Sequence, residues 1–123
     1  MIGKQTVINY VGYMMDSYLL FTLQNYAAKL VEKETSPKYY FMDTGLLGLM
    51  LMDCASAQLE NLVAIELIRR YGAEKVFYFE NNVEIDFYVP EAKLAIQVSM
   101  QVLDNIDTRE RETGAFVKLR SYI

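Results

Sequence analysis

Two short runs of alternating residues hold the side chains that could do chemistry in this chain. One run is Val83–Val89 and the other is Leu94–Ser99. Apolar and polar residues alternate in both, and a period of two predicts half-buried β-strands. If the two strands are neighbours, Asp86 and Gln97 share a polar face. We expect this pair to be the centre of any functional site, with the rest of the chain as its support.

The same alternation assigns each side chain to a face of the predicted sheet. In the first run, the residues expected to face a core are Val83, Ile85, Phe87 and Val89. The residues expected on the opposite face are Glu84, Asp86 and Tyr88. In the second run, Leu94, Ile96 and Val98 point one way, and Ala95, Gln97 and Ser99 point the other.

Composition narrows the possible chemistry. The chain has 123 residues, which suggests one domain, or one small domain with an appendage. It contains no histidine, which removes histidine metal sites, Ser-His-Asp triads and Cys-His dyads. A metal site must therefore use carboxylates, amides and carbonyls, which suit magnesium, manganese or calcium. The net charge of −4 argues against a broad basic surface for nonspecific DNA binding, although a local basic patch stays open.

The compartment follows from cysteine use and the absence of a targeting pattern. The single cysteine, Cys54, allows no internal disulfide and fits a small core residue in a reducing compartment. The N-terminus lacks the basic region and apolar run of a secretory signal. Thr6–Val31 is apolar-rich, but polar residues interrupt it, and a membrane span needs about 20 mostly apolar residues. We expect a cytoplasmic protein that does not enter a membrane.

The first half of the chain is expected to form a helix and a long-looped hairpin. Apolar residues recur at helical spacing in Thr6–Met15. Tyr18–Leu23 and Lys38–Asp43 are predicted strands, joined by the polar connection Ala27–Lys38. This order resembles the tail of a winged-helix module.

The second half is expected to run helix, strand, strand, strand, helix. A helix with apolar residues at helical spacing covers Ala57–Tyr71, and Gly72 follows as a stop signal. Asn81-Asn82 is a turn dipeptide that predicts a hairpin into Val83–Val89. The other predicted elements are a short apolar turn or helix at Leu46–Met52, strands at Val76–Glu80 and Lys93–Ser99, and a helix from Asp107 toward Leu119.

Five segments in this order resemble a known family. They are K-Y-Y-F-M-D-T-G-L-L (Lys38–Leu47), L-E-N-L-V-A-I-E-L (Leu59–Leu67), V-E-I-D-F (Val83–Phe87), A-I-Q-V-S (Ala95–Ser99) and D-T-R-E-R-E (Asp107–Glu112). Their order and spacing resemble the C-terminal domain of unknown function on many prokaryotic AAA ATPases. That domain is similar to the PD-(D/E)XK, or restriction-endonuclease-like, superfamily. The resemblance covers the chain from about Thr6 to its end.

The resemblance implies a set of catalytic and metal-binding positions. Nucleases of this superfamily place carboxylates on the first helix and second strand, and a Glu or Gln followed by a Lys on the third strand. The carboxylates hold magnesium, which activates water. The matching residues are Glu60, Asp86 and Gln97, but the lysine position holds Ser99, which supplies no cation. No other lysine is expected on the polar face. Arg109 or Arg111 on the following helix could substitute.

The resemblance also implies the domain organisation. Residues 1–53 would be a winged-helix-like tail and connector, and residues 54–123 a restriction-endonuclease-like core, truncated at its C-terminus. An ATPase domain normally precedes this domain in the family. The chain has no G-x-x-x-x-G-K-[ST] phosphate loop, so we expect no bound nucleotide. The fold class is α/β or α+β, with a mixed sheet of three or four strands flanked by helices.

Three functions stay open. The first is a non-catalytic, nuclease-like accessory domain that recognises nucleic acid or protein, or docks on an ATPase domain. The second is an active nuclease that binds magnesium or manganese weakly through Glu60, Asp86 and Gln97. The third is a structural self-association module, a homodimer formed through Val7, Tyr10, Met14 and Leu20.

Overall fold

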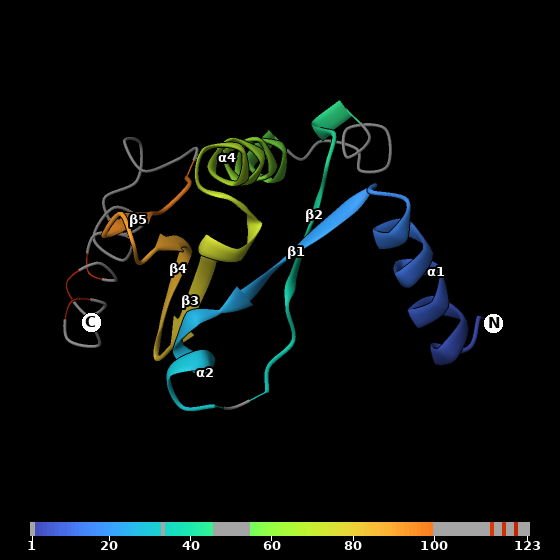
Figure 1. The fold of residues 1–123 in the computed structure, drawn as a ribbon, viewed down its shortest axis with the longest axis horizontal. Coiled ribbons are helices and arrows are strands. Elements are labelled where there is room, and N and C mark those ends of the chain that lie inside the picture. Colours follow the sequence, from blue (N-terminus) through green and yellow to red (C-terminus); the bar gives the residue numbers. More distant parts are fainter. Residues whose placement is uncertain are drawn as a thin grey trace.

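The chain folds around a single five-stranded sheet with helices on both faces (Figure 1). The computed structural model describes residues 2–32, 34–45 and 55–99, together with Gly114, Val117 and Arg120. In chain order the elements are α1 (Lys4–Asp16), β1 (Leu20–Asn25), α2 (Tyr26–Leu30), β2 (Lys38–Phe41), α4 (Ala55–Tyr71), the 3-10 helix η1 (Ala73–Lys75), β3 (Phe77–Asn81), β4 (Val83–Val89) and β5 (Leu94–Ile96).

The sheet is mixed, which confirms the predicted fold class. The strand order is β2-β1-β3-β4-β5. β1 runs parallel to β3, and the other neighbouring pairs are antiparallel. The predicted hairpin of β1 and β2 belongs to the same sheet as β3, β4 and β5, which therefore has five strands instead of three or four. Strands from both sides of the proposed boundary at residues 53 and 54 thus pair in one sheet, and the division into two domains stays a prediction.

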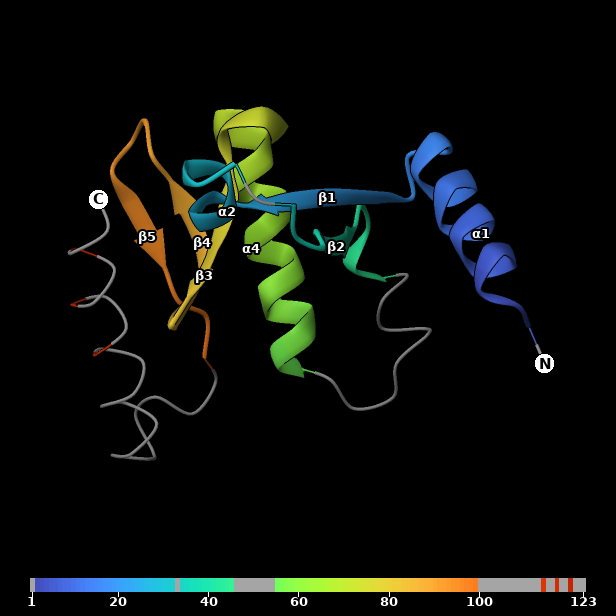
Figure 2. The same cartoon turned by 90° about the horizontal axis from the view of Figure 1, so that it is seen from below.

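Each face of the sheet packs against a different helix. Ala64 and Leu67 of α4 join a buried cluster with Tyr78 of β3, and Ala27 of α2 joins a second cluster with Phe79. Tyr78 and Phe79 are consecutive in β3, so their side chains point to opposite faces. The two clusters therefore lie on opposite sides of the sheet. Figure 1 shows α4 on one side of the strands and α2 on the other, and Figure 2 shows the same elements from below.

A bulge in β4 overturns the predicted assignment of its faces. Phe77 pairs with Tyr88 and Phe79 pairs with Ile85, so two steps along β3 match three steps along β4. An extra residue in one strand reverses the alternation beyond it. As a result Ile85 and Tyr88 join the cluster under α2, whereas Phe87 joins the cluster under α4. The four expected core residues do not share one face. Because Asp86 alternates with Ile85, it lies on the α4 side of the sheet.

Several predicted elements are confirmed, and one was missed. The helix at Thr6–Met15, both strands of the first hairpin and the long helix ending at Tyr71 are present. The connection Ala27–Lys38 was predicted to be a polar linker, which was wrong in part because α2 begins it. The Asn25 side chain caps α2 by accepting a hydrogen bond from the Ala27 N–H at 3.1 Å. The elements predicted at Leu46–Met52 and Asp107–Leu119 lie outside the continuously described ranges.

Helix α1 stands apart from the packed body. It lies beyond the start of β1 at one end of the molecule (Figure 1). None of its residues is buried. The described part of the chain includes no helix that is both long and apolar enough to cross a membrane.

Candidate functional site

Asp86 and Gln97 meet at the point where the β4–β5 ladder ends. The last ladder pair is Phe87 with Ile96, and beyond it side chains replace the backbone bonds. The Asp86 N–H donates to Gln97 Oε1 at 3.0 Å, and the Val98 N–H donates to Asp86 Oδ2 at 2.8 Å. The convergence predicted from the sequence is therefore present. It uses one Asp86 oxygen and the Gln97 carbonyl oxygen to join the two chain segments.

Lys38 brings a cation to this site from β2, at one edge of the sheet. Its Nζ atom lies 3.1 Å from Glu84 Oε1 and 3.9 Å from Asp86 Oδ1. The expectation that the polar face holds no lysine was wrong. Lys38 begins β2, which is separated from β4 by β1 and β3 in the strand order. The sequence did not predict this contact, because alternation within a strand predicts contacts only with the strands next to it, and β2 and β4 are not adjacent.

One aromatic residue, Tyr78, holds Lys38 in place. Its Nζ atom lies 5.2 Å from the centroid of the Tyr78 ring, within the range of a cation–π contact. The Tyr78 hydroxyl donates to the carbonyl oxygen of Ser36 at 2.6 Å. Tyr78 thus fixes the segment just before β2 and supports the lysine that follows it. A polar tip on a buried aromatic ring commonly plays such a positioning role.

Glu60 reaches the same region from α4. Its Oε1 atom accepts a hydrogen bond of 2.7 Å from the Tyr40 hydroxyl. The next residue, Asn61, is 2% exposed. Its side chain accepts a hydrogen bond from the Phe41 N–H at 2.8 Å and donates one to the Phe41 carbonyl oxygen at 2.9 Å. Asn61 therefore fixes the register between α4 and β2, and so the position of Glu60 relative to Lys38.

Burial and nearby charges shift the pKa values of Asp86 and Lys38. Burial raises the pKa of Asp86, as do the carboxylates of Glu60 and Glu84, while the Val98 hydrogen bond and the Lys38 cation oppose the rise. Burial by itself lowers the pKa of Lys38. The hydrogen bond to Glu84 and the three carboxylates outweigh that effect, so the net shift raises the pKa. Lys38 therefore stays charged and offsets part of the negative charge.

Tyr40 stays protonated and donates its hydroxyl hydrogen to Glu60. Burial raises the pKa of Tyr40, and the hydrogen bond to Glu60 raises it further. The hydroxyl therefore stays protonated at any ordinary pH. We call the set Lys38, Tyr40, Glu60, Glu84, Asp86 and Gln97 the carboxylate cluster.

The predicted metal ligands in this cluster already have partners within the chain. The described ranges contain no group of three or more Asp, Glu, Cys or His residues placed to hold a metal ion. Of the predicted ligands, Glu60 Oε1, Asp86 Oδ2 and Gln97 Oε1 each accept a hydrogen bond within the chain. Lys38 also supplies a positive charge beside the carboxylates. The metal-binding and catalytic roles of these residues stay predictions.

Other charged and polar residues are not counted in the carboxylate cluster. Glu66 accepts hydrogen bonds from Arg69 and Arg70, with oxygen to nitrogen distances of 2.6 to 2.9 Å, on the exposed side of α4. These neighbours hold the pKa of Glu66 at about 2. Ser99 is half-buried just after β5, and Arg109 and Arg111 lie outside the described residues.

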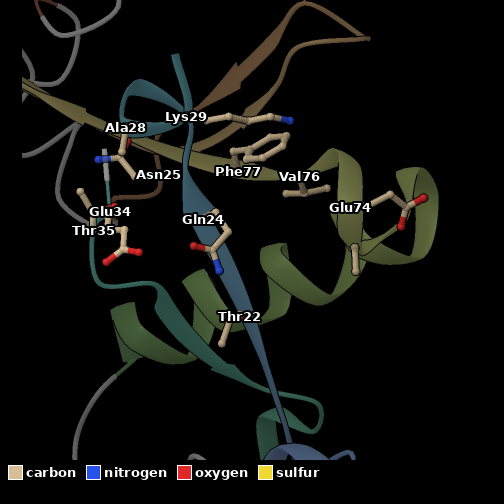
Figure 3. A pocket seen from close by; sticks show the side chains of 11 residues that line it. Thr22, Gln24, Asn25, Ala28, Lys29, Glu34, Thr35, Glu74, Val76 and Phe77 are labelled. Carbon is tan, nitrogen blue, oxygen red and sulfur yellow. The ribbon is translucent and has the colours of Figure 1, made fainter. Parts of the chain in front are cut away.

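One hollow opens on part of the carboxylate cluster, and another lies apart from it. One, of about 350 Å³, lies between β2 and α4 and is lined by Lys38, Tyr40 and Glu60, but not by Glu84, Asp86 or Gln97. The other, of about 580 Å³, lies over the β1–β3 junction and includes none of the predicted site residues (Figure 3). There Lys29 lies over the Phe77 ring at 4.8 Å, so its cation already has a partner.

Comparisons with known proteins give two matches. Residues 1–58 match a family described as a domain of unknown function, DUF8612. The uncharacterized protein MJ1544 of Methanocaldococcus jannaschii is 34% identical over 121 residues. That alignment covers 95% of this chain but 27% of the relative, so the chain spans just over a quarter of the relative's length. No solved structure matches the chain.

Proposed function

We propose that this chain is a non-catalytic, restriction-endonuclease-like accessory domain of an AAA-ATPase-type protein. The observation that carries the proposal is the position of Lys38, whose Nζ atom lies 3.1 Å from Glu84 and 3.9 Å from Asp86. In a nuclease of this type a metal ion offsets the charge of the carboxylates. Here a lysine side chain supplies part of that charge from within the fold. The site then needs no divalent ion to be stable.

The hydrogen bonds of the cluster support a structural role. Asp86 Oδ2 and Gln97 Oε1 both bind backbone N–H groups, which joins β4 to the segment after β5. Buried polar groups that are satisfied in this way specify one arrangement of the chain. A catalytic pair would instead direct these oxygens toward a ligand. The winged-helix character of the N-terminal segment and the link to an ATPase domain rest on the sequence resemblance.

The surface charge favours a protein partner over nucleic acid. The chain carries a net charge of −4. Arg69 and Arg70, the adjacent basic pair of α4, both bind Glu66 and so are partly neutralised. Binding to a phosphate backbone depends on cations that can replace counterions. The greater length of the archaeal relative agrees with a domain that works beside other domains.

A cleavage assay tests this proposal. Single-stranded DNA, duplex DNA and RNA would be incubated with the chain in the presence of magnesium or manganese. We expect no cleavage above that of Asp86→Asn, which keeps the size of the side chain and an oxygen for the Val98 N–H. Metal-dependent cleavage by the wild type that disappears in Asp86→Asn would overturn the proposal.

One observation favours an active magnesium-dependent nuclease as the second candidate. Lys38 could replace the lysine that Ser99 does not supply, because its cation lies beside Asp86. In that case Lys38→Met would abolish cleavage, whereas Lys75→Met would leave it unchanged. Lys75 is a suitable control because it pairs with Glu91 on the exposed surface, 2.9 Å away, and belongs to none of the cluster's contacts.

A further inference from the structure

We propose that α1 pairs in an antiparallel arrangement with α1 of a second copy of this chain. This inference is independent of the carboxylate cluster. Ile8 and Met15, which lie on the same side of this helix, are 52% and 36% exposed, and no residue of α1 is buried. A short helix gains most of its stability from packing an apolar face. The exposed apolar surface of α1 therefore needs a partner.

Gly12 indicates where that partner approaches. A glycine in the interior of a helix destabilises that helix relative to alanine. A Cβ atom added at Gly12 would meet nothing within 4 Å, so the fold of a single copy does not require glycine there. Close approach of a second helix would account for it, because a glycine leaves room for a side chain of the neighbour.

The residues around Gly12 form a seam along one side of α1. Gln5, Ile8, Gly12 and Met15 follow one another at spacings of three, four and three residues. This spacing keeps them on one face of the helix and is typical of a helix that packs along another. Ile8 and Met15 supply exposed apolar side chains, and Gly12 lies between them.

The charges of α1 favour an antiparallel partner. Lys4 stands in the first turn and Asp16 at the last position, and α1 has no acidic residue in its first turn and no basic residue in its last. Both charges oppose the dipole of their own helix, which favours acidic residues at the start and basic residues at the end. In an antiparallel pair, Lys4 lies beside the end of the second helix and Asp16 beside its start. Both charges are then favourable.

One register of the two helices pairs both the opposite charges and the seam residues. When Lys4 of one copy faces Asp16 of the other, the same two-fold symmetric register places Ile8 opposite Gly12. The isoleucine side chain then fills the space that the glycine leaves. A parallel pair would instead place each charge beside an equal charge. The arrangement thus commits to a second copy with a defined direction.

The size of the contact sets the expected strength. A helix of 13 residues is about 20 Å long. Two such helices bury less surface than the roughly 800 Å² per partner of a standard interface. We therefore expect a weak dimer with a dissociation constant on the order of 10 to 100 µM.

Sedimentation velocity on the full chain tests the proposal, over concentrations from about 5 µM to about 500 µM, which bracket the expected dissociation constant. The sedimentation coefficient should rise from that of a monomer to that of a dimer. Gly12→Leu should weaken association by at least about tenfold because the leucine fills the space for Ile8. Its control, Thr6→Leu, adds apolar bulk about 120° around the helix and should leave association within about twofold, because it lies off the seam.

Charge reversal tests the direction of the pair. Lys4→Glu alone should weaken association several-fold, and Lys4→Glu combined with Asp16→Lys should restore it. A monomer at every concentration would overturn the proposal and leave α1 to a partner of different sequence. A dimer that is unaffected by Gly12→Leu would overturn it as well, because the contact would then lie elsewhere.

Discussion

Lys38 Nζ lies 3.9 Å from Asp86 Oδ1, although their strands are not neighbours in the sheet. The contact spans from β2 to β4 and brings a cation to the only buried carboxylate among the described residues. A buried charge is costly unless it has a partner. Lys38 and the Val98 N–H together provide that partner. This relationship leads to predictions on titration, stability and metal binding.

The first prediction concerns the titration of Asp86. Its pKa should lie above its ordinary value of 3.8, chiefly because the side chain is buried. The folded state then binds this proton more tightly than the unfolded chain. The free energy of unfolding from this group should therefore fall as the pH rises from 3.8 to the folded pKa. NMR titration of the carboxyl carbon measures the pKa directly.

Two variants separate the causes of that shift. Lys38→Met should raise the pKa of Asp86 further, because it removes the cation that favours the ionised form. Glu60→Gln should lower it, because it removes a nearby negative charge. A pKa of Asp86 that does not respond to Lys38→Met would contradict the ion pair described above.

The second prediction concerns Asn61, which joins α4 to β2. Asn61→Ala removes the hydrogen bonds to both the N–H and the carbonyl of Phe41. We expect a loss of about 2 to 3 kcal/mol in the free energy of unfolding, because the Phe41 groups lose their side-chain partner. Urea denaturation measures the loss. Asn9→Ala, an exposed asparagine on α1, is the matched control and should change stability by less than about 0.5 kcal/mol.

The third prediction concerns Asn25, which joins β1 to β3. Its amide nitrogen donates to the Glu80 carbonyl at 2.9 Å, and its oxygen accepts from the Glu80 N–H at 3.0 Å. Asn25→Asp keeps the shape and the helix cap but places a carboxylate oxygen against that carbonyl. The free energy of unfolding should fall by about 1 to 3 kcal/mol.

The control for this variant is Asn81→Asp, at an exposed position on β3. It makes the same chemical change without a buried partner and should leave thermal stability nearly unchanged. Equal effects of the two variants would show that the loss comes from added negative charge and not from the contact with Glu80.

Much of the fold follows from local sequence patterns. The alternation of apolar and polar residues predicted β4, and the turn residues Asn81-Asn82 predicted the hairpin of β3 and β4. Apolar residues at helical spacing predicted α1 and α4. Asn82 has a φ of 56°, the left-handed conformation that its residue type tolerates. The sequence predicted that Asp86 and Gln97 would share a face if their strands were neighbours, and β4 and β5 do pair in the sheet.

Features that depend on distant contacts were not predictable in this way. The extra residue in β4 leaves the alternating pattern of residue types intact, so it shows only in the pairing with β3. Lys38 looked like an ordinary first residue of a strand, because its partners lie 46 and 48 residues further along the chain. Helix α2 has five residues, too few for a periodic signal, although Asn25 is a recognisable cap.

We propose that Lys38 provides the positive charge that a metal ion would otherwise provide. Calorimetric titration of manganese into wild type and Lys38→Met tests this claim most directly, with Lys75→Met as the control. We predict that Lys38→Met binds manganese at least about tenfold more tightly than wild type, because its carboxylates lose their internal cation. Adding Asp86→Asn to Lys38→Met should abolish the gain. Tight binding by wild type that Lys38→Met leaves unchanged or weakens would contradict the claim.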